Sequence, residues 1–115
     1  MEECIFCKIV GGEVSSKKVF ENELFLAFFD ANPKVEGHSL IIPKKHFENI
    51  LDFDPLLGEE LIYFVKKVFE ILKKDFGAEG FNIVQNNFKP AGQVVNHLHF
   101  HILPRKIGDG YSLGL

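Results

Sequence analysis

Apolar and polar positions along the chain follow two different periods, and the change from one period to the other divides the sequence into elements. Short apolar or alternating runs bounded by Gly, Pro, Asn and Asp predict five β-strands, at residues 17–20, 24–30, 39–42, 81–86 and 95–104. The first two strands form a hairpin around residues 21–23, and Pro43 closes the third strand. Residues 4–10 predict a short helix that ends at Gly11-Gly12.

One long helix is predicted to begin at Asp54 and to end before Gly77. Asp54 suits the N-cap, Pro55 suits the first helical position, and Gly77 suits the C-terminal cap. The apolar side chains recur at helical spacing along one stripe, formed by Leu57, Leu61, Phe64, Val68, Leu72 and Phe76, which is typical of core packing. The order of elements predicts an α+β fold: an antiparallel sheet of about five strands, one long helix on one face, and a short N-terminal helix.

Length and charge narrow the function classes. A chain of 115 residues fits one domain, residues 1–115, which can fold without disulfides. The net charge is −3 and basic residues occur as isolated pairs, so we expect no nucleic-acid partner. No apolar run reaches the roughly 18 residues that span a bilayer, and the acidic start at residues 1–3 is unlike a signal peptide. We therefore expect a cytoplasmic protein without a membrane partner.

Three histidines at alternate positions form the most informative motif. In an extended strand His97, His99 and His101 share one face, about 6.6 Å apart along the chain, while Leu98 and Phe100 take the other. Three readings are open. The residues could be a solvated strand face, a three-histidine metal centre, or a nucleophilic site in which His99 attacks phosphorus and His101 hydrogen-bonds the phosphate or the leaving group. A metal centre is the weaker of the two functional readings, because collinear side chains point in parallel and do not converge.

The motif His97-Leu98-His99-Phe100-His101-Ile102-Leu103 resembles the signature of the histidine-triad (HIT) nucleotide hydrolases and transferases, near the Hint branch. The resemblance covers nearly the whole chain. It includes the opening Cys4-Ile5-Phe6-Cys7-Lys8-Ile9, the segment Phe28-Phe29-Asp30, the run from Gly37 to His46, and Ala91-Gly92-Gln93 before the triad. It implies a purine nucleotide hydrolase, acting on phosphoramidates or dinucleoside polyphosphates, that works as a homodimer. The apolar stripe of the long helix is compatible with such a dimer.

The resemblance also implies roles for single residues. His99 would be the nucleotidylated nucleophile, His101 would contact the phosphate and leaving group, and His38 would support the triad from an adjacent strand. Asp30 would bind the ribose hydroxyls, whereas Asn86 and Gln93 would bracket the phosphate. An apolar slot for the purine would be formed by Ile5, Phe6, Ile9, Phe28 and Ala31. The alternatives are plain core packing for the apolar residues and turn hydrogen bonds for Asp30, Asn86 and Gln93.

Val94 departs from the family pattern. The Hint and Fhit branches usually carry a hydroxyl residue directly after the Gly-Gln pair, where it assists the leaving group. The resemblance places Val94 among the nucleotide-binding residues, but its side chain has no proton to give to a leaving group. Protonation of the leaving group would then fall on His101, on a backbone amide or on water. This departure keeps a second function class open, a nucleotide-binding interaction module with weak or vestigial catalysis.

Cys4 and Cys7 supply half of a tetrahedral thiolate-imidazole site, and the chain has histidines that could complete it. Relatives that keep this Cys-x-x-Cys pair are similar in using it for a structural zinc ion. His46, just beyond the third strand, and His97, at the start of the triad, are the expected partners. The alternatives for the two thiols are a reduced dithiol and a redox pair.

Overall fold

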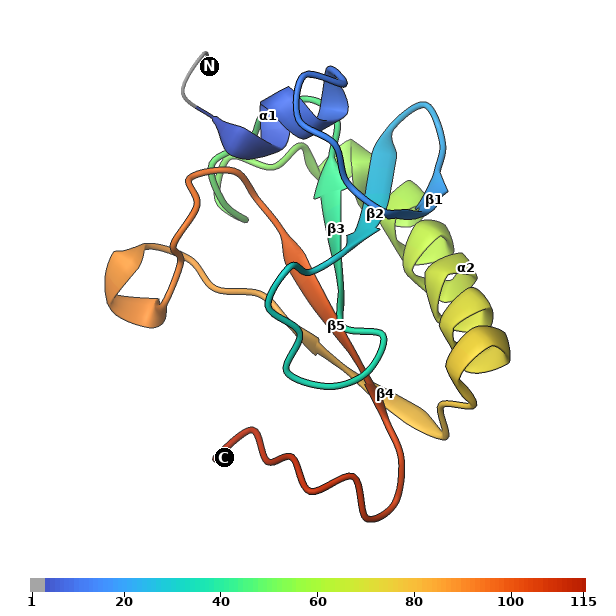
Figure 1. The fold of residues 1–115 in the computed structure, drawn as a ribbon. Coiled ribbons are helices and arrows are strands. Elements are labelled where there is room, and N and C mark those ends of the chain that lie inside the picture. Colours follow the sequence, from blue (N-terminus) through green and yellow to red (C-terminus); the bar gives the residue numbers. More distant parts are fainter. Residues whose placement is uncertain (1–3) are drawn as a thin grey trace.

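The computed structural model describes residues 4–115, so the acidic start at residues 1–3 lies outside the described residues. The sheet has five antiparallel strands. Figure 1 shows α1 at one end of the sheet and α2 running alongside it. The elements in chain order are α1 (Ile5–Val10), β1 (Lys18–Glu21), β2 (Phe25–Phe29), β3 (Ser39–Pro43), η1 (Pro55–Leu57), α2 (Gly58–Phe76), β4 (Gly80–Val84), η2 (Lys89–Ala91) and β5 (Phe100–Arg105). The strands lie in the order β1-β2-β3-β5-β4, which confirms the predicted α+β fold.

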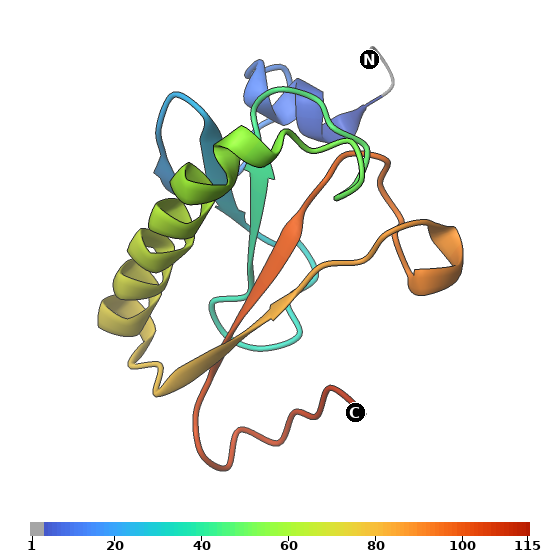
Figure 2. The same ribbon diagram turned by 180° about the vertical axis from the view of Figure 1, so that it is seen from behind.

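The sheet carries an apolar cluster on each face. Alternate residues of β2 divide between them: Phe25 and Ala27 pack toward α2, whereas Leu26 and Phe28 pack toward α1. This division follows from the alternation of side chains along a strand. Both faces are therefore covered, one by the long helix predicted for it and the other by the short N-terminal helix. Figure 2 shows the same arrangement from behind.

The long helix begins later than predicted. Asp54 accepts a hydrogen bond from the backbone N–H of Leu56 at 2.9 Å, but the turn that it caps is the 3-10 turn η1, and α2 follows from Gly58. Pro55 has no N–H, and its carbonyl accepts the N–H of Gly58 in the tighter three-residue turn. The C-terminus is as predicted: Gly77 has φ 67° and donates its N–H to the carbonyl of Lys73.

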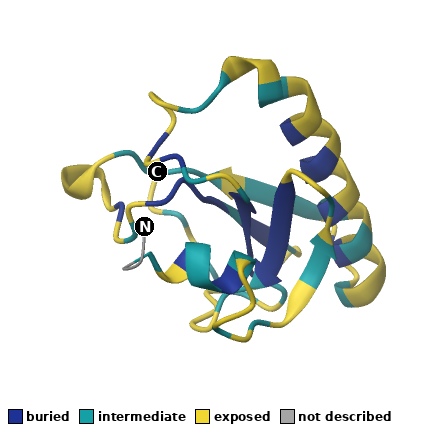
Figure 3. Ribbon diagram, turned by 90° about the horizontal axis from the view of Figure 1, so that it is seen from above, coloured by how far each residue is buried: buried dark blue, intermediate teal, exposed yellow. Residues whose placement is uncertain are grey.

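The apolar stripe of α2 belongs to the core of its own chain. Leu61, Phe64, Val68 and Leu72 are buried against the sheet, and Figure 3 shows the buried positions of α2 on the side that faces the strands. None of the helices within residues 4–115 has the length and apolar character needed to span a bilayer. Since the stripe is already covered, it is not the surface through which two chains could pair.

The strand that carries the triad is shorter than predicted, and β4 also ends two residues early, at Val84. Regular pairing of β5 with β3 starts at Phe100, opposite Ile41, so residues 95–99 approach the sheet as irregular chain. Pro43, at the end of β3, has no N–H to continue the ladder. Leu98 instead donates its N–H to the carbonyl of Phe47 at 2.7 Å. The alternation of faces nevertheless holds, because Leu98 and Phe100 are buried in the cluster under α2.

Candidate active site and metal centre

A cavity of about 950 Å³ opens on the face of the sheet that α1 partly covers. Its walls come from α1, the segment before β1, the end of β2 with the loop that follows, β3, and the chain that leads into β5. Ten of the predicted site residues line it: Ile5, Phe6, Ile9, Phe28, Asp30, Ala31, His38, Val94, His99 and His101. The tertiary structure therefore brings the expected nucleophile, the expected apolar slot and the expected ribose ligand to one hollow.

His99 is held in a single tautomer. Its Nδ1 lies 2.7 Å from the backbone carbonyl of His97, so Nδ1 carries the proton and donates it to that oxygen. The other nitrogen, Nε2, then has a free lone pair. The ring is buried, with its edge against Phe6 at a centroid distance of 5.2 Å, and burial lowers the pKa of His99. A buried, neutral imidazole with one unprotonated nitrogen is the form that a nucleophile requires.

His101 is held in the opposite tautomer by a chain of hydrogen bonds. The backbone N–H of Lys34 donates to Nδ1 of His38 at 3.0 Å, so the proton of His38 is on Nε2. That Nε2–H lies 3.0 Å from Nδ1 of His101, which accepts it. The proton of His101 is consequently on Nε2. Burial is the main cause that lowers the pKa of both rings, to about 4 for His101, although the carboxylate of Asp30 opposes the shift.

Asp30, His38 and His101 have ligand atoms within 4.8 Å of one another, yet their hydrogen bonds do not suit a metal. A metal ion bound to Nε2 of His38 would have to displace the proton on that nitrogen, which is there because Nδ1 accepts a hydrogen bond from Lys34. Nδ1 of that ring could not take up the proton, because it already accepts from the amide of Lys34. Metal-bound histidines normally donate from their second nitrogen, which is the reverse of this arrangement. The cluster is therefore organised to hold a proton chain and not an ion.

The low pKa of His101 gives a direct pH prediction. A base whose pKa is lowered stays neutral to lower pH, so the imidazole of His101 should remain uncharged as the pH falls through 6.5 and take up a proton only near pH 4. Histidine NMR signals followed from pH 8 to pH 4 test this, with the urea-unfolded chain as the reference. A midpoint for His101 near 6.5 in the folded protein would contradict the hydrogen-bonded, buried arrangement.

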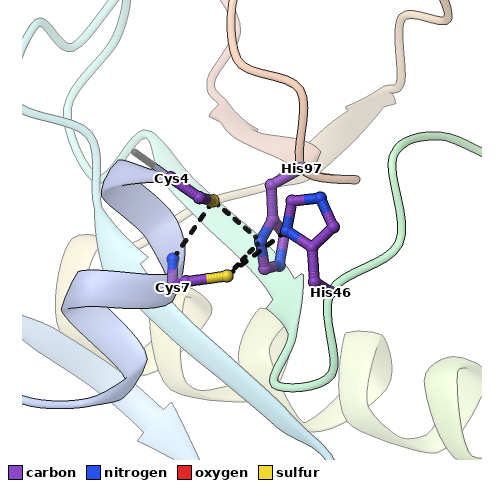
Figure 4. A group of neighbouring side chains, drawn as sticks. All are labelled: Cys4, Cys7, His46 and His97. Atoms are coloured by element: carbon purple, nitrogen blue, oxygen red, sulfur yellow. Dashed lines mark hydrogen bonds between the residues drawn. The ribbon is translucent and has the colours of Figure 1, made fainter. Parts of the chain in front are cut away.

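Cys4, Cys7, His46 and His97 form the second cluster, shown in Figure 4. Their four ligand atoms all lie within 4.8 Å of one another, although the residues come from α1, the chain beyond β3 and the chain before β5. Nδ1 of His97 lies 3.3 Å from Sγ of Cys4 and 3.5 Å from Sγ of Cys7, and Nδ1 of His46 lies 3.3 Å from Sγ of Cys7. A tetrahedral ion with Zn–S and Zn–N bonds of about 2.3 and 2.1 Å would separate such atoms by roughly 3.6 Å.

The protonation of this cluster also fits a metal. Nε2 of His97 donates to the carbonyl of Pro43 at 2.8 Å, which leaves a lone pair on the Nδ1 that faces the thiols. Burial, with Cys4 beside it, raises the pKa of the Cys7 thiol to about 11. The thiolate therefore needs a positive neighbour, and a bound cation would supply one. Two thiols that lose their protons to an incoming cation, together with two neutral imidazoles, can hold a tetrahedral metal ion.

Two of the predicted phosphate contacts lie elsewhere. Gln93 is buried and its carboxamide is used within the protein: Oε1 accepts the N–H of Phe88 at 2.7 Å, and Nε2 donates to the carbonyls of Glu48 and Val95. Neither Gln93 nor Asn86 lines the cavity.

Asp30, the expected ribose ligand, uses only Oδ1 in a turn. That oxygen accepts the N–H of Asn32 at 2.8 Å, while Oδ2 lies 3.5 Å from Nε2 of His38.

The partners that fix the tautomers were missed by sequence reasoning. They are backbone groups, namely the carbonyls of His97 and Pro43 and the amide of Lys34. Every residue type has a backbone carbonyl, so no sequence motif could have predicted which backbone groups hydrogen-bond these histidines.

Fold and site together define a histidine-triad protein, with one neutral imidazole that carries its proton on Nδ1 and a second that carries its proton on Nε2. The HIT domain family model matches residues 11–108. The chain therefore belongs to the HIT domain family.

Relatives of this chain match it in sequence along most of their own length. An uncharacterized HIT-like protein of Methanocaldococcus jannaschii is 54% identical over 110 residues, which cover 93% of this chain and 82% of that protein. The adenosine 5'-monophosphoramidase hnt1 of Schizosaccharomyces pombe is 42% identical over 112 residues, 97% of this chain and 80% of the enzyme. A crystal structure of a zinc-bound histidine triad family protein from Mycobacterium smegmatis superimposes with a TM-score of 0.91 at 34% identity, covering 97% of this chain and 81% of that one.

Proposed function

We propose that the protein is a purine nucleotide hydrolase that cleaves phosphoramidate or phosphoanhydride bonds through a covalent nucleotidyl-His99 intermediate. One observation carries the proposal. The hydrogen bond from Nδ1 of His99 to the carbonyl of His97 leaves Nε2 unprotonated in a ring that lines the cavity. The name of the Schizosaccharomyces pombe relative, an adenosine 5'-monophosphoramidase, supports the same class of reaction.

The proposed reaction has two displacements at phosphorus. In the first, the lone pair on Nε2 of His99 forms the P–N bond, while the bond to the leaving group breaks and its electron pair leaves with that group. In the second, water attacks phosphorus, the P–N bond breaks, and His99 recovers its lone pair as a proton passes to solvent. The Nε2–H of His101 donates a hydrogen bond to a phosphate oxygen in both steps, where the negative charge is concentrated.

The remaining cavity residues bind and orient the nucleotide in this proposal. Phe6 and Phe28, whose rings meet edge to face at 5.6 Å, form part of the apolar slot for the purine together with Ile5, Ile9 and Ala31. Oδ2 of Asp30, free of the turn that uses Oδ1, accepts the ribose hydroxyls. Asn86 and Gln93 are left out of the proposed phosphate contacts because they do not line the cavity.

We further propose that the metal of the Cys4, Cys7, His46 and His97 cluster is zinc and that it is structural. Thiolate and imidazole are its preferred ligands, and four protein ligands leave no position open for catalysis. The zinc-bound relative supports this assignment. Both cysteines are free thiols, which is compatible with the cytoplasm as the proposed place of action.

Homodimerisation also remains a proposal. Among residues 4–115, β4 has a strand neighbour on one side only, and Ile83 in it is half exposed. An edge of this kind presents unpaired backbone groups that a second copy can take up. It is a better candidate for the contact than the stripe of α2, which is buried.

Affinity and turnover, measured side by side, separate the proposed enzyme from a binding module. We expect the wild type to hydrolyse a purine nucleotide substrate, and His99→Ala to retain AMP affinity within about threefold while turnover falls by about 10³-fold or more. AMP titration by calorimetry and product release by chromatography give the two quantities. Tight AMP binding with equal turnover in both proteins would contradict the enzyme and favour the binding module.

A further inference from the structure

The two thiols of the metal cluster are also placed to bond to each other. Cys4 is the N-cap of α1, and Cys7 follows in the first turn, where its backbone N–H donates to Sγ of Cys4 at 3.3 Å. The two sulfur atoms lie within 4.8 Å of each other, and Figure 4 shows both directed toward the ring of His97. Cys-x-x-Cys is the spacing that disulfide oxidoreductases oxidise and reduce reversibly. Turning the two side chains can therefore close a disulfide within this turn of chain.

Oxidation and metal binding exclude each other at this cluster. Both cysteines are free and only partly buried, so a small oxidant can reach them. The thiolate is the form of cysteine that binds a metal, and a disulfide offers none. The imidazoles of His46 and His97 would then be the remaining ligands of the cluster, too few for a tetrahedral site. They are the chain's only two cysteines, so an intrachain disulfide has one possible pairing.

His97 connects the metal cluster to the nucleophile. Its Nδ1 faces the two thiols at 3.3 and 3.5 Å, and its Nε2 donates to the carbonyl of Pro43 at 2.8 Å. Its own carbonyl accepts the Nδ1–H of His99 at 2.7 Å. Metal ligands are oriented by the groups that hold both ring nitrogens. The residue that sets the tautomer of His99 is therefore itself positioned by the state of the thiols.

Phe6 makes a second connection, because it lies between the two cysteines in the sequence. Its buried ring packs edge to face on His97 at a centroid distance of 5.8 Å, on His99 at 5.2 Å and on Phe28 at 5.6 Å. A disulfide would change the side-chain torsions on both sides of Phe6 and would remove the contact of Cys7 with His46. The wall of the cavity and the packing of the nucleophile would move with this turn of α1.

We propose that Cys4 and Cys7 form a redox-modification site, at which a hydroperoxide converts the dithiol to a disulfide, releases the metal and stops nucleotidyl transfer to His99. This inference rests on the proposed function and on the proposed metal site. It makes turnover depend on the oxidation state of two side chains that do not touch the nucleotide.

The oxidation has two steps when hydrogen peroxide is the oxidant. One sulfur attacks the peroxide: an S–O bond forms, the O–O bond breaks, and the departing hydroxide takes up a proton to become water. The second sulfur then attacks the sulfenic acid: the S–S bond forms, the S–O bond breaks, and a second water leaves. The two sulfurs lose two electrons in all and the peroxide oxygens gain them. A dithiol reductant reverses the change by thiol–disulfide exchange.

The test treats the zinc-loaded wild type with hydrogen peroxide. Intact mass should show the loss of two hydrogen atoms per chain, and a metal-sensitive dye should show the release of one zinc ion per chain. A misplaced nucleophile and a displaced aromatic wall are expected to lower turnover of adenosine 5'-monophosphoramidate by about 10²-fold and AMP affinity by about tenfold. Dithiothreitol together with zinc should restore both quantities, whereas dithiothreitol alone should restore only the thiols.

Chelation of the reduced protein is the matched control, since it should cause the same losses but be reversed by zinc alone. Cys7→Ser cannot form the intrachain disulfide, so peroxide should leave its remaining turnover unchanged. Amide exchange over the sheet and α2 should stay slow after oxidation, which separates a local change near α1 from unfolding.

Four results would overturn the inference: protein that carries no metal as purified, peroxide that yields no intrachain disulfide, a disulfide that forms while zinc stays bound, or zinc release with turnover and AMP affinity unchanged. Loss of turnover through unfolding of the sheet would overturn it as well. Turnover that needs His99 but resists peroxide would contradict this inference and leave the proposed function standing. Turnover of the reduced protein that survives unchanged in His99→Ala would overturn the proposed function itself.

Discussion

Replacing His101 with alanine should trap the nucleotide on His99. The substitution removes the Nε2–H of His101, the proton that the hydrogen bond from His38 to Nδ1 leaves available for the phosphate. It leaves untouched the contact of His99 with the carbonyl of His97, so the nucleophile keeps its lone pair. An anhydride substrate can still react, because its leaving group departs as an anion. Both displacements lose the phosphate hydrogen bond of His101, but the first keeps a leaving group that departs readily as an anion. Hydrolysis of the adduct by water should therefore become the slower step, reduced by about 10²-fold or more.

Intact-mass measurement soon after mixing with substrate reads the result. We expect the mass of one nucleotidyl group per chain on the His101→Ala protein, and peptide mapping should place it on His99. The matched control is His99→Ala combined with His101→Ala, which should show no added mass. An adduct that persists in the double variant would contradict the assignment of the nucleophile. Absence of both adduct and turnover with every purine nucleotide tried would count against the whole mechanism.

Removing zinc should cost the protein much of its stability. The proposed ligands join three segments far apart in the chain, and such a site does not exist in the unfolded state, so metal binding contributes directly to folding. Without metal, α1 is held mainly by Phe6 and Ile9 in the apolar cluster above β2 and β3. We expect chelation to lower Tm by about 10 °C or more. Amide exchange should increase over residues 4–12, and the metal affinity should fall at lower pH because the thiols must be deprotonated.

Cys4→Ser and Cys7→Ser should each reproduce the effect of chelation, since serine keeps the size of the side chain but is a poor zinc ligand. His99→Ala is the control, because it should abolish turnover while the metal stays bound. Elemental analysis of protein purified without chelator measures the occupancy, and calorimetry measures Tm. Well under one zinc per chain, together with an unchanged Tm in both cysteine variants, would rule out the site.

The periodicity of apolar residues was sufficient to predict which helices and strands form, but not the residues at which they begin and end. The stripe from Leu57 to Phe76 predicted the helix that covers the sheet, and alternation placed Leu98 and Phe100 opposite the histidines. The irregular chain before Phe100 was not foreseen, because it follows from a missing partner: Pro43 on the neighbouring strand has no N–H to offer. Gln93 shows the same limit, since its amide is hydrogen-bonded to backbone groups of Phe88 and Val95 close by in the chain and of the distant Glu48.

The sequence by itself determined which chemical groups are present: three alternating histidines, a Cys-x-x-Cys pair, and a valine where a hydroxyl could have stood. It also determined the face of the strand that the histidines share, because a strand repeats every two residues. Only the tertiary structure decided what each imidazole does. The tautomer of a ring depends on which backbone carbonyl or amide meets each nitrogen. His97 offers Nδ1 to the thiols and its carbonyl to His99, and the amide of Lys34 sets His38 and His101. The contacts of His97 with Cys4 and of His38 with His101 join segments distant in the chain, whereas the carbonyl of His97 and the amide of Lys34 act on histidines two and four residues away. The division of labour among identical side chains therefore depends on the fold.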